Sequence, residues 1–261
     1  MKFFKTLFLA ITFLLILSPQ SFALTISPSL FEIQTEPGVP QTFTLNVYND
    51  GQRKYNIKSY IWDLSFNRKN KKTYKPPSGK AESIAKYINL SDKNFILEPK
   101  ENKVVSFTIT IPKGVIGGKQ AIAFFDATPI VPKDNAPVRL LMTASLGVTI
   151  LQETKGTVEI KSRIKSVKFI NPNTTNPLIM ELNVVNQGNT HIFGSAVVAI
   201  TKGENTFIGS FRVPGTIIFP KKSALLKGSF EGDIQPGAYN ALITYHFRDK
   251  DIVITKNFTV N

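Results

Sequence analysis

Side chains that commonly perform chemistry are sparse in this sequence of 261 residues. There is no cysteine, and the only two histidines, His191 and His246, lack acidic or cysteine partners at a spacing typical of a metal site. The sequence has no nucleophile elbow, no His-Glu-x-x-His motif, no glycine-rich phosphate loop and no calcium loop. We therefore predict no catalytic residue, no metal and no cofactor. An enzyme whose residues converge only in the fold is kept as a third hypothesis.

One segment is patterned instead for binding through its backbone. Apolar residues occupy every second position from residue 140 to 150, and mostly small or polar residues fill the other face. We predict a long strand at a sheet edge, able to accept a strand from a partner protein. The other interpretation is a strand that is paired on both sides and buried in the core. The alternating row consists of Leu140, Met142, Ala144, Leu146, Val148 and Ile150.

A second segment is patterned by charge. It holds six cations, with Tyr74 and Pro76-Pro77 between them. We call this segment the basic loop, and such a cluster favours an anionic neighbour, for example a wall polymer, a glycan or a membrane surface. The other interpretation is a solvated hairpin tip. The cations are Arg68, Lys69, Lys71, Lys72, Lys75 and Lys80.

Residues 1–23 have the features of a signal peptide. Lys2 and Lys5 precede an apolar stretch, and Ser21-Phe22-Ala23 supplies small residues for cleavage. The apolar stretch is shorter than the about 20 residues that span a bilayer, so a retained anchor is the alternative. We predict a bacterial protein exported to the periplasm or cell surface, which makes nucleic acid an unsuitable partner. The net charge of +14 suits either an anionic neighbour or simple solubility.

An internal duplication indicates which elements position these segments. The phrase Leu45–Gly51 recurs as Leu182–Gly188, and a Pro-Lys turn follows each copy, at Pro99-Lys100 and Pro220-Lys221. A strand-like segment then closes each half. Each copy therefore reads as alternating strands joined by polar turns, which is typical of a β-sandwich.

We predict an all-β chain of two tandem immunoglobulin-like β-sandwiches. The first domain is expected at residues 24–154 and the second at 155–261, after the signal peptide. Trp62, the only tryptophan, is interpreted as core or sandwich-edge packing rather than a ligand platform. The second half should form seven strands, at 164–170, 179–185, 194–201, 206–213, 224–230, 238–247 and 251–260.

Several phrases make the chain resemble the PapD-like periplasmic pilus chaperones. They are Leu24–Pro28, the turn Asn49-Asp50-Gly51 with Tyr60-Ile61 after it, Leu97–Lys100, and the alternating strand at 140–150. The resemblance implies that the last strand of the first domain lends its apolar row to an unfinished pilin subunit. It also implies that two basic residues in the interdomain cleft hold the terminal carboxylate of that subunit.

The sequence departs from that family at the basic anchors. Leu30 stands near the position of the family's arginine and Gly147 near that of its lysine, and the only cation of the long strand is Arg139 at its start. The carboxylate clamp is therefore not supported, while strand donation is retained. The two-domain plan is also similar to the ectodomains of Gram-positive WxL-interacting surface proteins.

Together these patterns favour an exported, non-enzymatic, chaperone-like factor for assembly of bacterial surface structures. Its expected partners are other exported or surface proteins, including pilin-like subunits. The alternative is a cell-wall or glycan-binding module that uses the basic loop.

Overall fold

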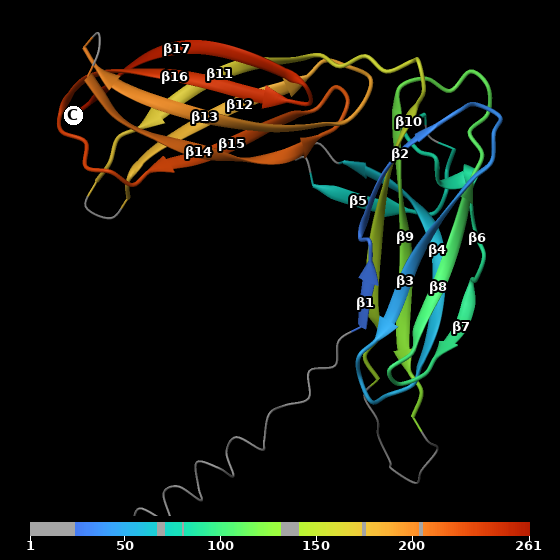
Figure 1. The fold of residues 1–261 in the computed structure, drawn as a ribbon. Helices are drawn as coiled ribbons and strands as arrows, with labels where there is room; N and C mark the ends of the chain where they lie inside the picture. The colour runs from blue at the N-terminus through green and yellow to red at the C-terminus, as the bar shows by residue number, and fades with distance from the viewer. Residues whose placement is uncertain (1–23, 67–70, 80, 132–140, 174–175, 204–205) are drawn as a thin grey trace, which may run out of the picture.

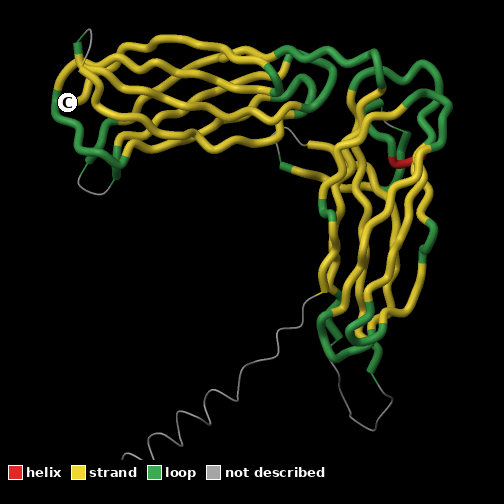
Figure 2. Tube along the Cα trace, viewed as in Figure 1, coloured by secondary structure: helices red, strands yellow, loops and turns green. Residues whose placement is uncertain are grey.

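The structure is a computed structural model that describes residues 24–261, apart from 67–70, 80, 132–140, 174–175 and 204–205. The described residues form seventeen strands and a single turn of 3-10 helix, η1 (Ala85–Tyr87). Strands fill two elongated bodies set at an angle to one another (Figures 1 and 2). The predicted all-β fold of two tandem sandwiches is confirmed. The predicted signal peptide lies outside the described residues.

The first sandwich packs a small sheet against a larger one. The small sheet has the order β1 (Leu24–Ser27), β3 (Gln41–Asn49), β8 (Asn102–Ile109), β6 (Ile88–Leu90). The larger sheet has the order β2 (Leu30–Thr35), β10 (Ala144–Thr154), β9 (Gly118–Pro129), β4 (Tyr55–Phe66), β5 (Lys72–Lys75), and β7 (Asn94–Leu97) also pairs with β4. Alternating apolar residues of both sheets close a core around Phe107 and Leu45.

The second sandwich contains the seven strands that the sequence predicts. One sheet has the order β11 (Ser162–Ile170), β12 (Leu178–Asn186), β15 (Ser223–Phe230). The other has the order β14 (Thr206–Ile218), β13 (Ile192–Lys202), β16 (Gly237–Phe247), β17 (Lys250–Val260). β14 extends beyond the predicted end at Val213, because a register shift opposite Gly194 and Ala196 lets the ladder continue past Pro214.

The duplicated phrase forms the same polar corner in both sandwiches. In the first, the Nδ2 of Asn49 donates to the carbonyls of Arg53 (2.7 Å) and Glu98 (2.9 Å), and its Oδ1 accepts from the Gly51 amide (3.0 Å). The carbonyl of Asn49 accepts from the amide of Lys100 (2.8 Å), which has a φ of 62°. One buried amide side chain thus satisfies three main-chain groups where the chain turns.

Asn186 repeats this arrangement in the second sandwich. Its Nδ2 donates to the carbonyls of Thr190 (2.7 Å) and Ile218 (2.8 Å), and its Oδ1 accepts from the Gly188 amide (2.9 Å). Lys221, with a φ of 61°, donates its amide to the Asn186 carbonyl (3.0 Å) as Lys100 does in the first half. The repeated phrase in the sequence therefore corresponds to the same hydrogen-bonded corner in both sandwiches.

The first sandwich draws its strands from residues 24–154 and the second from 162–260. A short connection at Lys155 and Gly156, where φ is 75°, separates β10 from the second body. We keep the predicted domain limits, 24–154 and 155–261, as a proposal.

Candidate partner-binding edge and the domain junction

Strand β10 has one half that is paired on both sides and one half that is not. Its residues 144–153 pair with β9, and Thr149–Thr154 also pair in parallel with Leu30–Thr35 of β2. Strand β1, which precedes β2 in the chain, belongs to the other sheet. The chain crosses from one sheet to the other at Pro28, after a cis Ser27–Pro28 bond. Among the described residues, the segment Ala144–Val148 therefore has no partner strand on its outer side. We call this segment the open edge.

The open edge presents main-chain groups to a potential partner strand. The amide of Thr149 donates to the carbonyl of Ser29 at 2.9 Å, so the main-chain groups of Thr149 point toward the β2 side. Alternate residues of a strand point their N–H and C=O groups in the same direction. The main-chain groups of Gly147 and Ser145 therefore also point outward, where no described strand pairs with them.

Within the described residues, the predicted apolar row faces the core of the first sandwich from Leu146 to Ile150 and is exposed at Met142 and Ala144. Val148 and Ile150 are completely buried, Leu146 is partly buried against the core, and Ala144 is exposed. Met142 is 77% exposed and precedes the strand. The predicted bounds were wrong here: β10 begins at Ala144 and ends at Thr154, because its ladder with β9 begins at the Ala144–Ala127 pair. Leu140 lies outside the described residues.

The long edge strands of the second sandwich show how this chain protects an edge. β11 carries Arg163, Lys165 and Lys168 and has a bulge between Ile164 and Ser166. β17 carries Lys250, Asp251 and Lys256. Charged residues and bulges discourage pairing with another chain. The open edge, with the sequence Ala-Ser-Leu-Gly-Val, has no charge, no proline and no bulge.

The two basic residues that the resemblance implies are absent from the positions near the open edge, which Leu30 and Gly147 occupy. Leu30 lies beside Thr149 in the β2–β10 register, and Gly147 lies two residues earlier along β10, on the same face. Neither residue can hold a carboxylate by charge. Arg139 lies outside the described residues.

A cation that sequence reasoning missed lies at the domain junction instead. Arg248, in the turn between β16 and β17, forms a salt bridge with Glu153 at the end of β10. Glu153 also accepts a hydrogen bond from Thr190 Oγ1 (2.6 Å). These contacts join the last strand of the first sandwich to two loops of the second. No local motif marks them, because the residues come from three distant segments.

His191 lies next to this ion pair and is buried. It lines a cavity of about 250 Å³ with Glu32 and Arg248, and its Nε2 is 3.6 Å from Glu32 Oε1 without a hydrogen-bond partner. Burial lowers the pKa of His191 below its ordinary value, and the nearby Arg248 acts in the same direction. The carboxylates of Glu153 and Glu32 oppose this shift. The junction thus favours a neutral imidazole.

We expect this histidine to make stability fall as the pH is lowered. Below the ordinary histidine pKa of about 6.5, the unfolded chain binds a proton that the folded protein resists, so the free energy of unfolding decreases toward the lowered folded pKa. The slope should reach at most about 1.4 kcal/mol per pH unit. Urea unfolding between pH 7.5 and 5.5 would measure it, and His191→Gln should reduce it. An unchanged slope in the variant would refute the assignment to His191.

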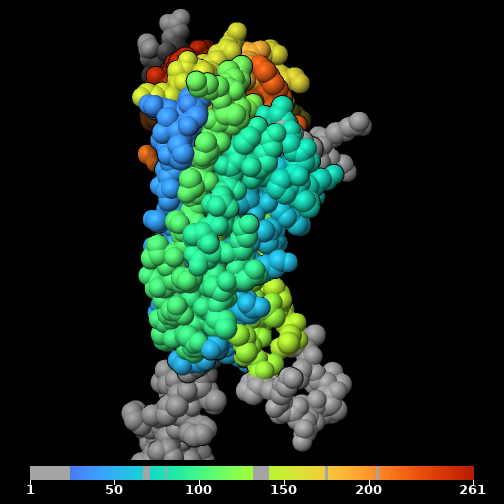
Figure 3. Space-filling view, turned by 90° about the vertical axis from the view of Figure 1, so that its right-hand side faces the viewer, coloured from blue at the N-terminus to red at the C-terminus, as the bar shows by residue number. Residues whose placement is uncertain are grey.

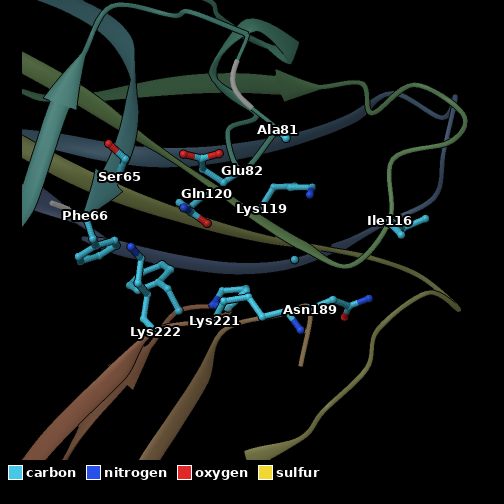
Figure 4. A pocket seen from close by; sticks show the side chains of 13 residues that line it. Ser65, Phe66, Ala81, Glu82, Ile116, Lys119, Gln120, Asn189, Lys221 and Lys222 are labelled. Carbon is cyan, nitrogen blue, oxygen red and sulfur yellow. The ribbon is translucent and has the colours of Figure 1, made fainter. Parts of the chain in front are cut away.

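The two sandwiches also meet on the side of β4 and β9, where a cavity of about 390 Å³ lies between them. Phe66 and Gln120 line it from the first sandwich, and Asn189 and Lys221 line it from the second (Figure 4). The ring of Phe66 packs against Phe219 with 4.3 Å between centroids. Seen from the right-hand side of Figure 1, atoms of both sandwiches meet at the top of the molecule (Figure 3).

The outer face of the larger sheet carries a group of rings that we call the aromatic face. It consists of Tyr60 and Trp62 of β4, Phe124 of β9 and Tyr74 of β5, with neighbouring centroids 5.1 to 5.8 Å apart. Trp62 is partly buried there, packed against Tyr60 and Phe124 outside the core cluster, so of the two kinds of packing predicted for it the one in the core does not occur. The alternation of β4 explains this, because Ile57 and Ile61 face the core and Trp62, one residue after Ile61, lies on the opposite face.

The basic loop is only partly described. Lys72 and Lys75 belong to β5, which pairs with residues 63–66 of β4, and these two lysines and Lys71 are exposed. Arg68, Lys69 and Lys80 lie outside the described residues. The described part is therefore one arm of a solvated hairpin.

No group of three or more His, Cys, Asp or Glu side chains in the described ranges is arranged to hold a metal ion. None of the helical structure described is long and apolar enough to cross a membrane.

Comparisons with known proteins place the fold. No family model and no curated protein matches the chain. A solved class 5 fimbriae chaperone, CfaA, is 15% identical with a TM-score of 0.48, covering 92% of this chain and 99% of its own. The SafB chaperone in complex with the SafA pilin of Salmonella enterica is 12% identical with a TM-score of 0.42, covering 93% and 99%. A CsuC–CsuE chaperone–tip adhesion subunit complex of Acinetobacter baumannii is 12% identical with a TM-score of 0.43, covering 89% and 97%. The solved proteins that this chain is similar to thus include fimbrial chaperones, the class that its sequence phrases resemble.

Proposed function

We propose that the chain is an exported, non-enzymatic, chaperone-like factor that binds pilin-like or other surface proteins by strand addition at the open edge. Residues 1–23 would direct its export to the periplasm or cell surface. The partner contributes an extended segment that pairs with Ala144–Val148, in line with β2 along the same side of β10.

One observation carries this proposal. The outer side of β10 is paired with β2 along Thr149–Thr154 and is unpaired along Ala144–Val148, where the charges and bulges of the other edge strands are absent. Gly147 and Ser145 point their main-chain groups outward, and each main-chain hydrogen bond formed there contributes about 0.5–1.5 kcal/mol. Strand addition uses such bonds for affinity and alternating side chains for specificity.

The apolar row indicates which kind of partner would be stabilised by binding at the open edge. Leu146 and Ala144 continue the core-facing row of β10 beyond the part that β2 covers. An added strand would cover this end of the core and would bury its own apolar row in exchange. A partner with an incomplete sheet, which has apolar residues to hide before assembly, fits this requirement.

Gly147→Pro is the direct test of the open edge. The Gly147 amide points away from β9, so proline removes a donor toward the partner without removing a ladder bond inside the sheet. We expect at least a tenfold loss of captured surface proteins from a periplasmic extract, since a lost bond and a blocked strand together exceed about 1.4 kcal/mol.

Gly147→Ala is the matched control, because it adds one carbon and keeps the amide donor. It should retain capture, and the melting temperatures of both variants should stay close to that of the parent chain. Equal capture by the proline and alanine variants would contradict strand addition at this edge. Val148 is unsuitable for such a test, because a charge at this buried position would disrupt the core.

The alternative function, binding of a wall polymer or glycan through the basic loop, keeps its place as a hypothesis. Lys71, Lys72 and Lys75 are exposed as it requires, but exposure is equally expected of any solvated hairpin. No specific observation in the described part of the loop favours it.

A further inference from the structure

The aromatic face begins beside the open edge. Gly147 of β10 lies opposite Phe124 of β9, and Phe124 lies opposite Tyr60 of β4, so the three positions form one row across the sheet. The rings of Phe124 and Tyr60 are 5.6 Å apart, and Trp62 contacts both. A strand added to the open edge would extend this row by one residue.

Gly147 has no side chain at the end of the row, and Ile122 and Phe124 of β9 pack over it. A Cβ at this position would lie 3.0 Å from Ile122 Cδ1 and 3.4 Å from Phe124 Cε1, so side chains of β9 lean over the glycine. Gly147 and Phe124 form a pair whose main-chain groups point away from each other, and side chains approach most closely in such pairs. Phe124 thus offers its ring edge toward the strand position next to Gly147.

The neighbouring rows limit where an apolar side chain of the partner can lie. In the row beyond Gly147, Ser145 donates to Asp126 (2.6 Å), and Tyr60 donates to the other oxygen of the same carboxylate (3.0 Å). In the row on the hinge side, Leu30 of β2 already occupies the place beside Thr149. One position, next to Gly147, is therefore apolar and open.

We propose that this row selects the partner segment and fixes its register. The added strand places one aromatic side chain beside Gly147, on the face opposite its core-facing apolar row, and an uncharged polar side chain beside Ser145. The aromatic side chain packs across the glycine against Phe124. This inference rests on the proposed strand addition and specifies the sequence that the edge accepts.

Trp62 provides the measurement, because it is the only tryptophan and belongs to the aromatic face. The probes are nine-residue peptides with blocked ends, with alternating valine and leucine on one face and serine on the other. A single phenylalanine replaces each serine in turn. We expect one phenylalanine position to tighten binding about five- to tenfold over the all-serine peptide and to change the Trp62 emission.

Variants of the row decide whether Gly147 and Phe124 cause the preference. Gly147→Val places a side chain between Phe124 and the added strand, and Phe124→Leu removes the ring, so each should abolish the preference for the phenylalanine position. Val104→Ser, at an exposed position of the smaller sheet, is the control and should preserve the preference. Circular dichroism checks that each variant is folded.

The outcomes separate the two proposals. If all peptides bind the parent chain equally, or if the preference survives in Gly147→Val, the inferred selection is wrong while strand addition stands. If no peptide binds the parent chain, strand addition itself fails and the inferred selection fails with it.

Discussion

Asn186→Ala is expected to destabilise the second sandwich by about 3 kcal/mol or more. The side chain is completely buried and holds two carbonyls and one amide of the corner, those of Thr190, Ile218 and Gly188. Alanine leaves these three main-chain groups without their partner, and each buried unsatisfied group costs about 1–3 kcal/mol. Entry of water into the space left by the amide offsets part of this cost, which makes the sum smaller than three full penalties.

Urea unfolding followed by far-ultraviolet circular dichroism would measure the loss, while Trp62 fluorescence follows the first sandwich alone. Asn49→Ala should give a matching loss in the first sandwich, because its side chain makes the equivalent three bonds. Asn183→Ala, at a half-buried position of the same strand, serves as the comparison variant. A loss below about 1 kcal/mol for Asn186→Ala would show that the corner is satisfied in another way.

The sandwich architecture could be predicted because its causes are local in sequence. A corner that needs one amide side chain and a following glycine leaves the phrase Asn-x-Gly in each half, at Asn49 and Asn186. Strands with one buried face leave a period of two, which located all seven strands of the second sandwich.

The extent of the open edge could not be predicted, because it depends on a partner more than one hundred positions away in the sequence. The apolar row of β10 alternates evenly in the sequence, yet Ile150 is buried and Ala144 is exposed. The difference arises where the chain crosses from β1 to β2 and begins to cover β10 at Thr149. Alternation reports which face a residue occupies and gives no information on which strands flank it.

The position of Trp62 on the outer face of its sheet could have been predicted from the sequence. Ile57 and Ile61 set the buried parity of β4, so Trp62 had to lie on the opposite face. The junction of Glu153, His191 and Arg248 is a different case, because three segments meet there only after both sandwiches have formed.

Gly118→Val is expected to separate the two sandwiches. The Gly118 amide donates to the Asn189 carbonyl (2.8 Å), and a Cβ on Gly118 would lie 2.3 Å from Thr190 Oγ1 and 2.9 Å from Thr190 Cα. The second contact is with backbone, so a change of rotamer cannot relieve it, and the loop must move away. That movement also removes the hydrogen bond from Thr190 to Glu153.

Small-angle X-ray scattering would detect this separation as a larger radius of gyration and a broader distribution of distances than in the parent chain. Each sandwich keeps its own core, so circular dichroism should remain that of a folded β protein, with a stability loss of roughly 2–3 kcal/mol. Lys113→Ala, at an exposed position in the loop that precedes β9, should leave the scattering unchanged. Identical scattering from Gly118→Val would mean that the backbone contact between the sandwiches does not set their angle. The second sandwich would then be positioned by the other junction contacts, such as the salt bridge of Arg248 with Glu153 and the packing of Phe66 against Phe219.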